Sequence, residues 1–210
     1  MTEEKLLYHI TDINNLDSIL QQGGLLANSI VKDKGVEYEN IAHTNIQDRR
    51  LTTNVPLHPN GNLHEYVPFY FSPRSPMLYA IHKGRVEKYE KGQSQIIYLV
   101  SRTDIIHNAG LEYVFTDGHA IMWFTEFYKD LKNLDKIDWD VMASHYWSDT
   151  PEDPDRRRRR QAEFLVHNIV PIDLFLGIAV KNEEMKQKVL KVLNKYNFDK
   201  LVLRKGSWYY

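Results

Sequence analysis

LLYHIT, residues Leu6–Thr11, is an apolar and β-branched run with the length of one strand, and it sets the fold from the start of the chain. Directly after it, apolar residues between Ile13 and Leu20 repeat at helical spacing, and Gly23 and Gly24 favour an end to the helix. The chain therefore opens with a strand followed by a helix.

Further strands and helices are predicted along the rest of the chain. Runs rich in valine, isoleucine and aromatic residues predict strands at Val67–Ser72, Gln95–Val100, Glu112–Thr116, Glu163–Asn168, Leu174–Val180 and Lys200–Arg204. Helical patterns are found after Pro76 through Tyr79 and Ile81, over Trp123–Leu134, and along the stripe Met185, Val189, Val192, Leu193 and Tyr196. Because no internal repeat is present, we expect one α+β domain over residues 1–210.

The segment from Asn28 to Asn62 has no clean period of either kind. It is polar and irregular, and it contains Gly35 and Pro56 among other turn residues. We expect a loop region with one helical piece. Long loops in compact domains tend to carry function, which makes this segment a candidate for ligand contacts.

Composition excludes several classes of protein. Among 210 residues, 27 are Lys or Arg and 28 are Asp or Glu, a formal net charge of −1 that excludes a uniformly basic binder of the histone type. The absence of cysteine excludes disulfides, Cys-based zinc sites, iron–sulfur clusters and thiol nucleophiles. Thr2–Lys5 lacks the start of a signal peptide, and no apolar run approaches the ~18 residues of a spanning helix. We therefore expect a cytoplasmic protein without membrane contact.

Familiar metal and nucleotide motifs are missing as well. The nine histidines include no pair at the spacing of a zincin, so no metal site is expected. No glycine pattern matches a P-loop or a Rossmann fingerprint, and no nucleophile elbow is present.

One charged segment departs from ordinary globular composition. Four acidic residues between Asp149 and Asp155 precede five consecutive arginines, Arg156–Arg160. A block of like charges persists when it is solvated or when it meets an anionic partner such as phosphate. Tyr146 and Trp147 lie just upstream, and aromatic rings beside guanidinium groups suit single-stranded nucleic acid. A solvated surface stretch and a nucleic-acid platform both remain open.

Several short motifs, weak alone, occur together in a specific order from residue 7 to the end of the chain. They are Leu7–Thr11, Ile46–Arg50, Pro68–Met77, Thr116–Ala120, Ala162–Val166 and Trp208–Tyr210. In this order they resemble the DarT family of bacterial DNA ADP-ribosyltransferase toxins, within the ADP-ribosyltransferase superfamily. The resemblance implies an α+β fold with a central split β-sheet flanked by helices.

The resemblance also implies an activity and its partners. A member of this family cleaves NAD+ without a metal and attaches ADP-ribose to a base of single-stranded DNA, most often thymine. It acts as the toxin of a toxin–antitoxin pair, and its partner is an antitoxin of macrodomain fold. The target base must be unstacked to reach a buried NAD+, which favours a single strand.

Roles for individual residues follow from the same resemblance. Glu163 is the expected catalytic carboxylate, and Arg50, ahead of Arg49, is the expected guanidinium that stabilises the deprotonated base or holds the NAD+ phosphate. The other expected NAD+ contacts are His9, Thr11, Gly24, Leu25, Tyr70, Ser72, Ser75 and Tyr79. The nucleic-acid contacts are expected instead from the turn at His119 and from the chemistry of the aromatic and arginine-rich segment, and they are His119, Tyr146, Trp147, Arg156, Arg157, Arg158 and Arg159.

Plainer explanations exist for these residues when each is taken alone. His9 is explained as a core histidine, Glu163 as a surface carboxylate on an edge strand, and His119 as a turn residue. Two other functions also stay open. One is an ADP-ribosyl- or phosphate-transferring enzyme that acts on RNA or protein. The other is a catalytically silent module that binds nucleic acid.

Overall fold

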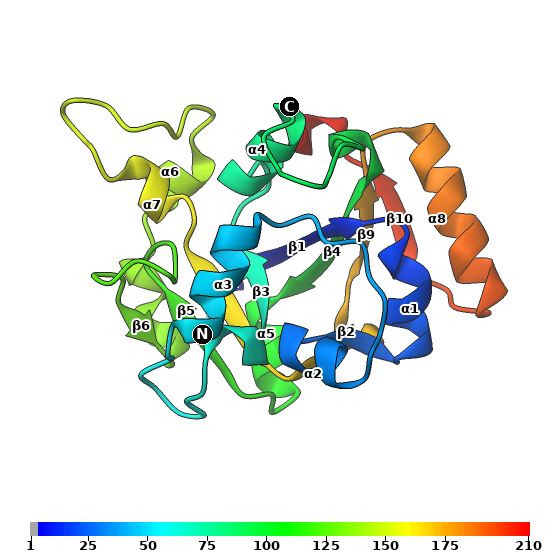
Figure 1. The fold of residues 1–210 in the computed structure, drawn as a ribbon, viewed down its shortest axis with the longest axis horizontal. Helices are drawn as coiled ribbons and strands as arrows, with labels where there is room; N and C mark the ends of the chain where they lie inside the picture. The colour runs from blue at the N-terminus through cyan, green and yellow to red at the C-terminus, as the bar shows by residue number, and fades with distance from the viewer. Residues whose placement is uncertain (1–3) are drawn as a thin grey trace.

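The computed structural model describes residues 4–210, so Thr2 and Glu3, on which the signal-peptide expectation partly rested, lie outside it. A large mixed sheet runs through the molecule and is flanked by helices (Figure 1), which confirms the predicted α+β class. The strands are β1 (Leu6–Asp12), β2 (Gly24–Leu26), β3 (Tyr66–Tyr70), β4 (Ile96–Arg102), β5 (Tyr113–Thr116), β6 (Phe127–Tyr128), β7 (Glu163–His167), β8 (Ile169–Pro171), β9 (Gly177–Val180) and β10 (Leu201–Arg204).

The helices are short except at the C-terminal end of the chain. In α8 the Asn182 side chain accepts a hydrogen bond from the Met185 amide and caps the helix, whose predicted stripe is buried at Met185, Val189 and Leu193. Within residues 4–210 no helix is both long and apolar enough to cross a bilayer. The helices are α1 (Asn15–Gln21), α2 (Asn28–Asp33), α3 (Thr44–Thr52), α4 (Pro76–His82), α5 (Thr103–Asn108), α6 (Trp139–Ala143), α7 (Arg156–Arg159) and α8 (Glu183–Lys195).

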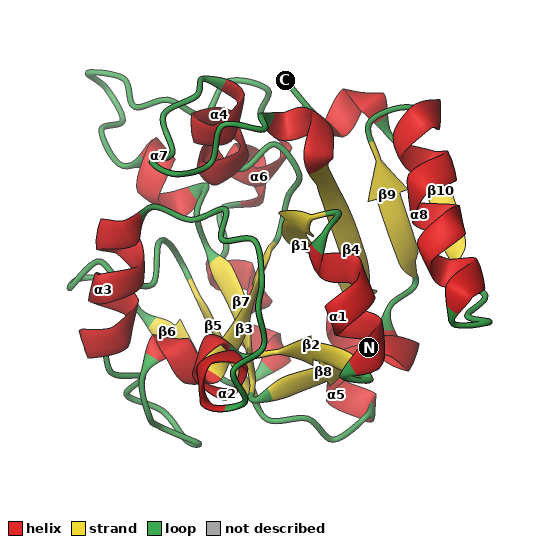
Figure 2. Ribbon diagram, turned by 45° about the vertical axis from the view of Figure 1, so that its right-hand side comes forward, coloured by secondary structure: helices red, strands yellow, loops and turns green. Residues whose placement is uncertain are grey.

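The main sheet is almost divided in two. Its strand order is β10-β9-β4-β1-β3-β7-β5-β6, and β2 and β8 form a separate two-stranded sheet (Figure 2). Every residue of β1 pairs with β4, whereas β1 and β3 are joined only by the pair Tyr8–Tyr70. The halves therefore diverge between β1 and β3, and this is the split sheet that the motifs implied.

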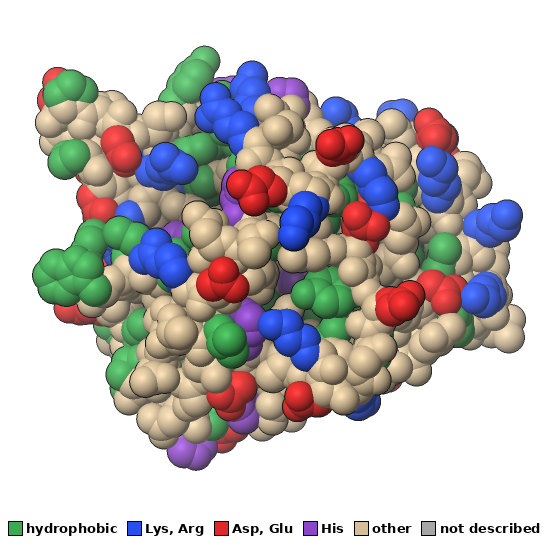
Figure 3. Space-filling view, viewed as in Figure 1, with side chains coloured by type: hydrophobic (Ala, Val, Ile, Leu, Met, Phe, Trp, Pro, Cys, Tyr) green, Lys and Arg blue, Asp and Glu red, His purple; other side chains and the backbone are tan. Residues whose placement is uncertain are grey.

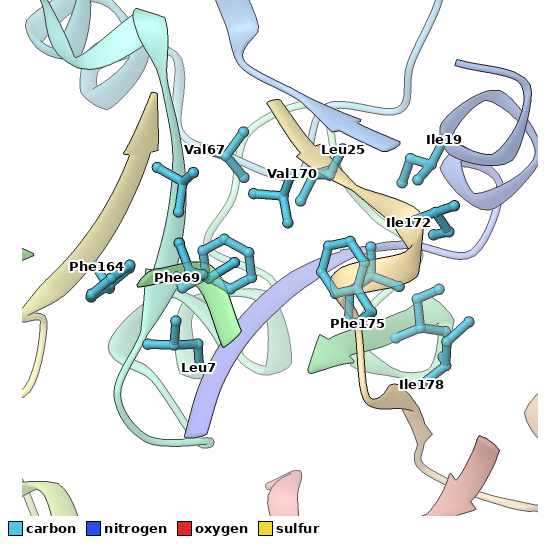
Figure 4. Packing of buried hydrophobic residues seen from close by; sticks show 14 of the residues in the cluster. Leu7, Ile19, Leu25, Val67, Phe69, Phe164, Val170, Ile172, Phe175 and Ile178 are labelled. Atoms are coloured by element: carbon cyan, nitrogen blue, oxygen red, sulfur yellow. The ribbon is translucent and has the colours of Figure 1, made fainter. Parts of the chain in front are cut away.

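Both faces of the central strands are covered. Phe69 and Phe164 pack with Leu7 and Phe175 in one apolar cluster (Figure 4), whereas Leu165, on the other face of β7, packs in another cluster. Strands buried on both sides read as nearly continuous apolar runs, which is why the sequence predicted them well. The interior position of β7 fixes the environment of its first residue.

The helix predicted over Trp123–Leu134 is wrong. Phe127 and Tyr128 instead pair with Thr116 and Phe115 as strand β6, and the carboxylate of Asp117 accepts a hydrogen bond from the Glu126 amide. A 3₁₀ turn follows over Leu131–Lys136. The helical spacing misled because Trp123 and Phe124, at the start of the segment, are exposed, so its apolar residues do not share one buried helix face with Leu131 and Leu134.

Two other predicted segments differ in detail. The Asn28–Asn62 segment contains two helices, α2 and α3, where one helical piece was expected. The strand predicted over Leu174–Val180 begins only at Gly177, because Ile172–Leu174 forms a 3₁₀ turn.

Candidate active site

A cavity lies where the two halves of the sheet diverge. His9 and Thr11 of β1, Pro68 and Tyr70 of β3, and Glu163 of β7 all line it. Water-sized molecules can occupy about 210 Å³ of it. Ligand sites are concave and mostly apolar with a few convergent polar groups, and this cavity has that composition.

Arg50 and Glu163 form a buried ion pair in this cavity. Their side chains are 10% and 4% exposed, and Arg50 Nη1 lies 2.7 Å from Glu163 Oε2. Helix α3 delivers Arg50 from the long polar segment, and β7 delivers Glu163 from an interior position of the sheet. The edge-strand explanation of Glu163 is therefore wrong. A carboxylate held in this way can stabilise positive charge that develops in a transition state.

The second oxygen of Glu163 is held by the backbone of the β5–β6 loop. The Ala120 amide donates to Glu163 Oε1 at 3.2 Å, and the Glu163 amide donates to Thr116 Oγ1 at 3.0 Å. Tyr70 pairs with Glu163 on the neighbouring strand, and burial followed by the Glu163 charge raises the pKa of Tyr70. Tyr70 is thus an uncharged hydroxyl and ring beside the carboxylate.

His119 lines the same cavity, although it was predicted as a nucleic-acid contact. Burial lowers the pKa of His119 to about 4, Glu163 opposes that shift, and Arg50 and the neighbouring arginines Arg49 and Arg157 add to it. The imidazole is therefore neutral near pH 7 and can act as a hydrogen-bond partner without charge.

His9 links the two halves of the split sheet. Its Nδ1 lies 2.8 Å from the carbonyl oxygen of Pro68, and burial lowers the pKa of His9 to about 4. Because a carbonyl only accepts, Nδ1 carries the proton of the neutral ring and Nε2 is left as an acceptor. His9 is more than a satisfied core residue, because it also lines the cavity, and an acceptor there suits a ribose hydroxyl.

Gly24, Leu25 and Thr11, which are expected to contact NAD+, also line the cavity. Gly24 must lack a side chain, because a Cβ there would lie 2.5 Å from the Val170 carbonyl oxygen on the paired strand β8.

Asn15 is a cavity residue that the sequence interpretation missed. It is buried, and its Nδ2 donates both to Thr11 Oγ1 and to the Glu39 carbonyl at 2.9 Å. The Glu39 amide returns a hydrogen bond to Asn15 Oδ1 at 2.6 Å. Asn15 thus ties the polar loop to β1. Its position at a helix start gave no signal, because capping explains an asparagine there equally well.

Three predicted NAD+ contacts lie outside the cavity lining, so the structure does not support that role for them. Ser72 Oγ donates to the Met142 carbonyl at 2.7 Å, and Ser75 Oγ caps α4 by accepting from the Leu78 amide. Tyr79 packs edge-on against Trp147 and Tyr210. The hydroxyls of these two serines serve local structure because α4 and α6 meet there.

Most side chains of the Arg156–Arg160 block bind other residues of the protein. Arg158 pairs with Asp117 and Asp155, and Arg159 pairs with Asp138 and Asp153. Acidic residues therefore neutralise Arg158 and Arg159, and these two side chains do not supply free cations to the expected nucleic-acid platform.

The remaining residues of the predicted nucleic-acid platform differ in their exposure to solvent. Trp147 is only 8% exposed and its Nε1 donates to Tyr210 Oη, so the prediction of a stacking surface at Trp147 is wrong. Arg156 donates to the Tyr146 carbonyl at 2.8 Å. Tyr146 is 81% exposed, and Arg157 is exposed, with no hydrogen bond or ion pair from its guanidinium to another residue among residues 4–210.

Arg49, the alternative to Arg50, bonds to the backbone, whereas Arg50 pairs with Glu163. Arg49 Nη2 donates to the Ile121 carbonyl at 3.0 Å, so it steadies the β5–β6 loop. Among residues 4–210, no group of three or more acidic or histidine side chains is arranged to hold a metal ion.

Comparison with known proteins places this site in a family. A family model described as ssDNA thymidine ADP-ribosyltransferase, DarT, matches residues 8–210. A DNA ADP-ribosyl transferase from Thermus sp. (strain 2.9) is 44% identical over 207 residues, which cover 97% of this chain and 95% of that protein.

Solved structures of the Thermus sp. 2.9 DarT share the fold. Its complex with ADP-ribosylated ssDNA gives a TM-score of 0.92 at 41% identity and covers 98% of this chain and 96% of that one. Its complex with NAD+ gives 0.88 at 40% identity and covers 98% of both chains.

A longer relative joins two activities. The DNA ADP-ribosyl transferase-DNA ADP-ribosyl glycohydrolase fusion protein of Thermosipho africanus is 27% identical over 193 residues, 91% of this chain and 46% of that protein. The family model over residues 8–210 and the 44% identity confirm the resemblance seen in the motifs. The chain belongs to the DarT family of single-stranded DNA thymidine ADP-ribosyltransferases.

Proposed function

We propose that this chain, as one domain over residues 1–210, cleaves NAD+ and transfers ADP-ribose to a thymine of single-stranded DNA. The observation that carries the proposal is the Arg50–Glu163 pair, buried in the cavity at the split of the sheet. Membership of the DarT family and the NAD+ and ssDNA complexes of the Thermus relative support the same substrates.

Glu163 acts where the glycosidic bond breaks. The bond between the ribose C1 carbon and nicotinamide breaks with its electron pair leaving on nicotinamide, so positive charge develops on the ribose. The carboxylate of Glu163, held by Arg50 and by the Ala120 amide, faces that charge and stabilises it. Its orientation is set before the reaction, so no side chain must reorganise.

Arg50 acts on the nucleophile. Thymine N3 is a poor nucleophile while it carries its proton, and the new bond joins N3 to the ribose carbon as the N3 proton passes to Glu163. The Arg50 guanidinium, 2.7 Å from that carboxylate, stabilises the negative charge that develops on the base. His9, with Thr11 beside it, binds the adenosine-side ribose.

The test is incubation of the purified protein with labelled NAD+ and single-stranded DNA, duplex DNA, RNA or protein. We expect label on single-stranded DNA with the wild type and at least a 100-fold slower reaction with Glu163→Gln. Glu183→Gln, on the exposed face of α8, is the matched control and leaves the rate unchanged. Label on RNA or protein alone contradicts the proposal. Equal rates for the wild type and Glu163→Gln also contradict it.

We infer that the chain is the toxin of a pair whose antitoxin is a macrodomain enzyme, and that it acts in the cytoplasm. The glycohydrolase fused to the Thermosipho africanus relative supports a partner that reverses the modification. Expression of the wild type should arrest bacterial growth, expression of Glu163→Gln should not, and a co-expressed DNA ADP-ribosyl glycohydrolase of macrodomain fold should restore growth. Growth arrest by both forms would contradict this role.

A further inference from the structure

An aromatic pair projects into solvent from the β5–β6 loop, residues 117–126. Trp123 is 92% exposed and Phe124 43% exposed, and their rings meet edge-on with centroids 5.4 Å apart. Figure 3 shows hydrophobic side chains projecting at the left edge of the molecule, where this loop lies in Figure 1. Full exposure of a tryptophan is unfavourable in isolation, so the pair needs an explanation outside the core.

The loop that carries the pair is fixed to the catalytic carboxylate. Ala120 donates its amide to Glu163, and the His119 carbonyl accepts from the Met122 amide at 3.0 Å and from Thr125 Oγ1 at 2.8 Å. The two aromatic residues lie between these anchor points. Their position relative to the active site is therefore set by hydrogen bonds on both sides of them.

Arg158 packs against the Phe124 ring of the aromatic pair. Its guanidinium carbon lies 4.9 Å from the centroid of the Phe124 ring, while its nitrogens pair with Asp117 and Asp155. The Arg158 carbonyl accepts the His119 amide at 3.0 Å, and Gly118 leaves room for the guanidinium. This arginine is thus committed to holding the loop and is not free to contact phosphate.

The chemistry of the surroundings favours unpaired nucleic acid as the occupant. A rigid aromatic surface offers stacking to any base, and a nearby cation tracks the backbone. Arg157 supplies that cation, because it is exposed and directly precedes Arg158, whose carbonyl accepts from the His119 amide and whose guanidinium lies over the Phe124 ring. The β5–β6 loop and the adjoining helix α7 therefore bring together the carboxylate, an exposed aromatic surface and an exposed guanidinium.

We propose that Trp123 and Phe124 form a stacking platform for a base next to the target base, with Arg157 contacting the adjoining phosphate. This inference rests on the proposed function, since it assigns the flanking-base subsite of the same reaction. The stacking platform then lies on the β5–β6 loop and not in the segment around Trp147. Arg158 is a positioning residue, because it holds that loop in place.

Binding of single-stranded DNA by fluorescence anisotropy in a Glu163→Gln background separates this proposal from the chemistry. Trp123→Ala should raise Kd about tenfold or more, Trp123→Phe should recover most of the affinity, and the salt slope of log Kd should stay unchanged. Arg157→Gln should instead reduce that slope by about 0.7, the value for one phosphate of a single strand. Leu201→Ala, an exposed apolar control on β10, should change neither quantity.

Intrinsic fluorescence provides a readout that does not need a change of affinity. Single-stranded DNA should quench the wild-type emission more than that of Trp123→Phe, because the exposed indole stacks on a base. Equal quenching, or an unchanged Kd for Trp123→Ala, overturns the platform while wild-type labelling of DNA still stands. If Tyr146→Ala weakens binding and Trp123→Ala does not, the platform belongs to the α6–α7 segment instead.

Discussion

At the scale of single residues, the site depends on two opposite charges, each of which has few other partners. Arg50 and Glu163 are shielded from water, so each is the main compensation for the other's charge, with the Leu63 carbonyl and the Ala120 amide as secondary partners. Removing one member of such a pair leaves an uncompensated buried charge, which is far less favourable than removing both. The proposed catalytic role and local stability therefore depend on the same pair of side chains.

A double-mutant cycle on this pair should reveal the coupling. Arg50→Ala should lower the free energy of unfolding by about 3–5 kcal/mol. Arg50→Ala combined with Glu163→Gln should lower it by less than the sum of the two single changes, with a coupling energy of about 0.5–3 kcal/mol. Urea denaturation measures all four proteins, and additive effects would show that the buried pair is not an energetic unit.

The two buried histidines predict how stability depends on pH. The pKa of His9 and of His119 is about 4 in the folded chain, against an ordinary value of about 6.5. Between these values the unfolded chain binds more protons, so the free energy of unfolding falls as the pH is lowered from about 6.5 to about 4, by up to about 1.4 kcal/mol per pH unit for each histidine.

The measurement is urea denaturation at several pH values across that window. His9→Asn and His119→Asn should each flatten the dependence, and the double variant should flatten it most. His9→Asn is a fair replacement because its amide can still donate to the Pro68 carbonyl. If neither variant changes the slope, the two imidazoles do not titrate between the folded and unfolded states in the way the burial implies.

At the scale of elements, the arginine-rich segment of α7 and Arg160 shows that a run of like charges can stabilise the fold through hydrogen bonds inside the protein. Arg160 is buried and donates to the carbonyls of Val141, Met142 and Pro73, at 2.6, 2.7 and 2.9 Å. It holds the end of α6 against the turn that follows β3. Its neighbour Arg157 is exposed. Two arginines three positions apart therefore have opposite roles.

Alanine substitutions at these two positions should separate stability from binding. Arg160→Ala leaves buried carbonyls without donors and should lower the free energy of unfolding by at least about 2 kcal/mol. Arg157→Ala, as the matched surface change, should alter it by no more than about 0.5 kcal/mol while weakening DNA binding. Chemical denaturation measures the first quantity, and similar losses for both variants would contradict the assignment.

Several elements could be predicted from the sequence because local pattern and burial agree. Strands β4 and β7 are buried on both faces and read as continuous apolar runs, and α8 has one buried stripe and a capping asparagine. The β5–β6 loop could not be predicted in this way. Its helical spacing includes Trp123, which lies in solvent, so periodicity there reflects a surface and not a packed face.

At the scale of the whole molecule, the site exists because of strand order. His9, Arg50 and Glu163 are far apart in sequence and meet because β1, β3 and β7 are neighbours and α3 covers the opening between them. Periodicity contains no information on which strands pair, so these residues could be grouped only through the resemblance to a family. The resemblance predicted that the carboxylate, the guanidinium and the first-strand histidine belong to one site, and all three line this cavity.

The same resemblance was less informative about details of contact. Ser72 and Tyr79 are hydrogen-bonded or packed elsewhere, and Trp147 is buried against Tyr210. Residue type and order do not report whether a hydroxyl or an indole faces a cavity or the protein, because that depends on which elements pack around it. Trp123 is the converse case, since its exposure became evident only in the folded chain.

The central claim is that Glu163, in the split of the sheet, directs ADP-ribose from NAD+ to thymine in a single strand. Mass spectrometry of single-stranded oligonucleotides with one thymine or none, after incubation with NAD+ and either the wild type or Glu163→Gln, tests it most directly. We predict one ADP-ribose on the thymine, with free nicotinamide in equal amount, only for the wild type and the thymine-containing strand. An adduct on the thymine-free strand, or an equal adduct with Glu163→Gln, would contradict it.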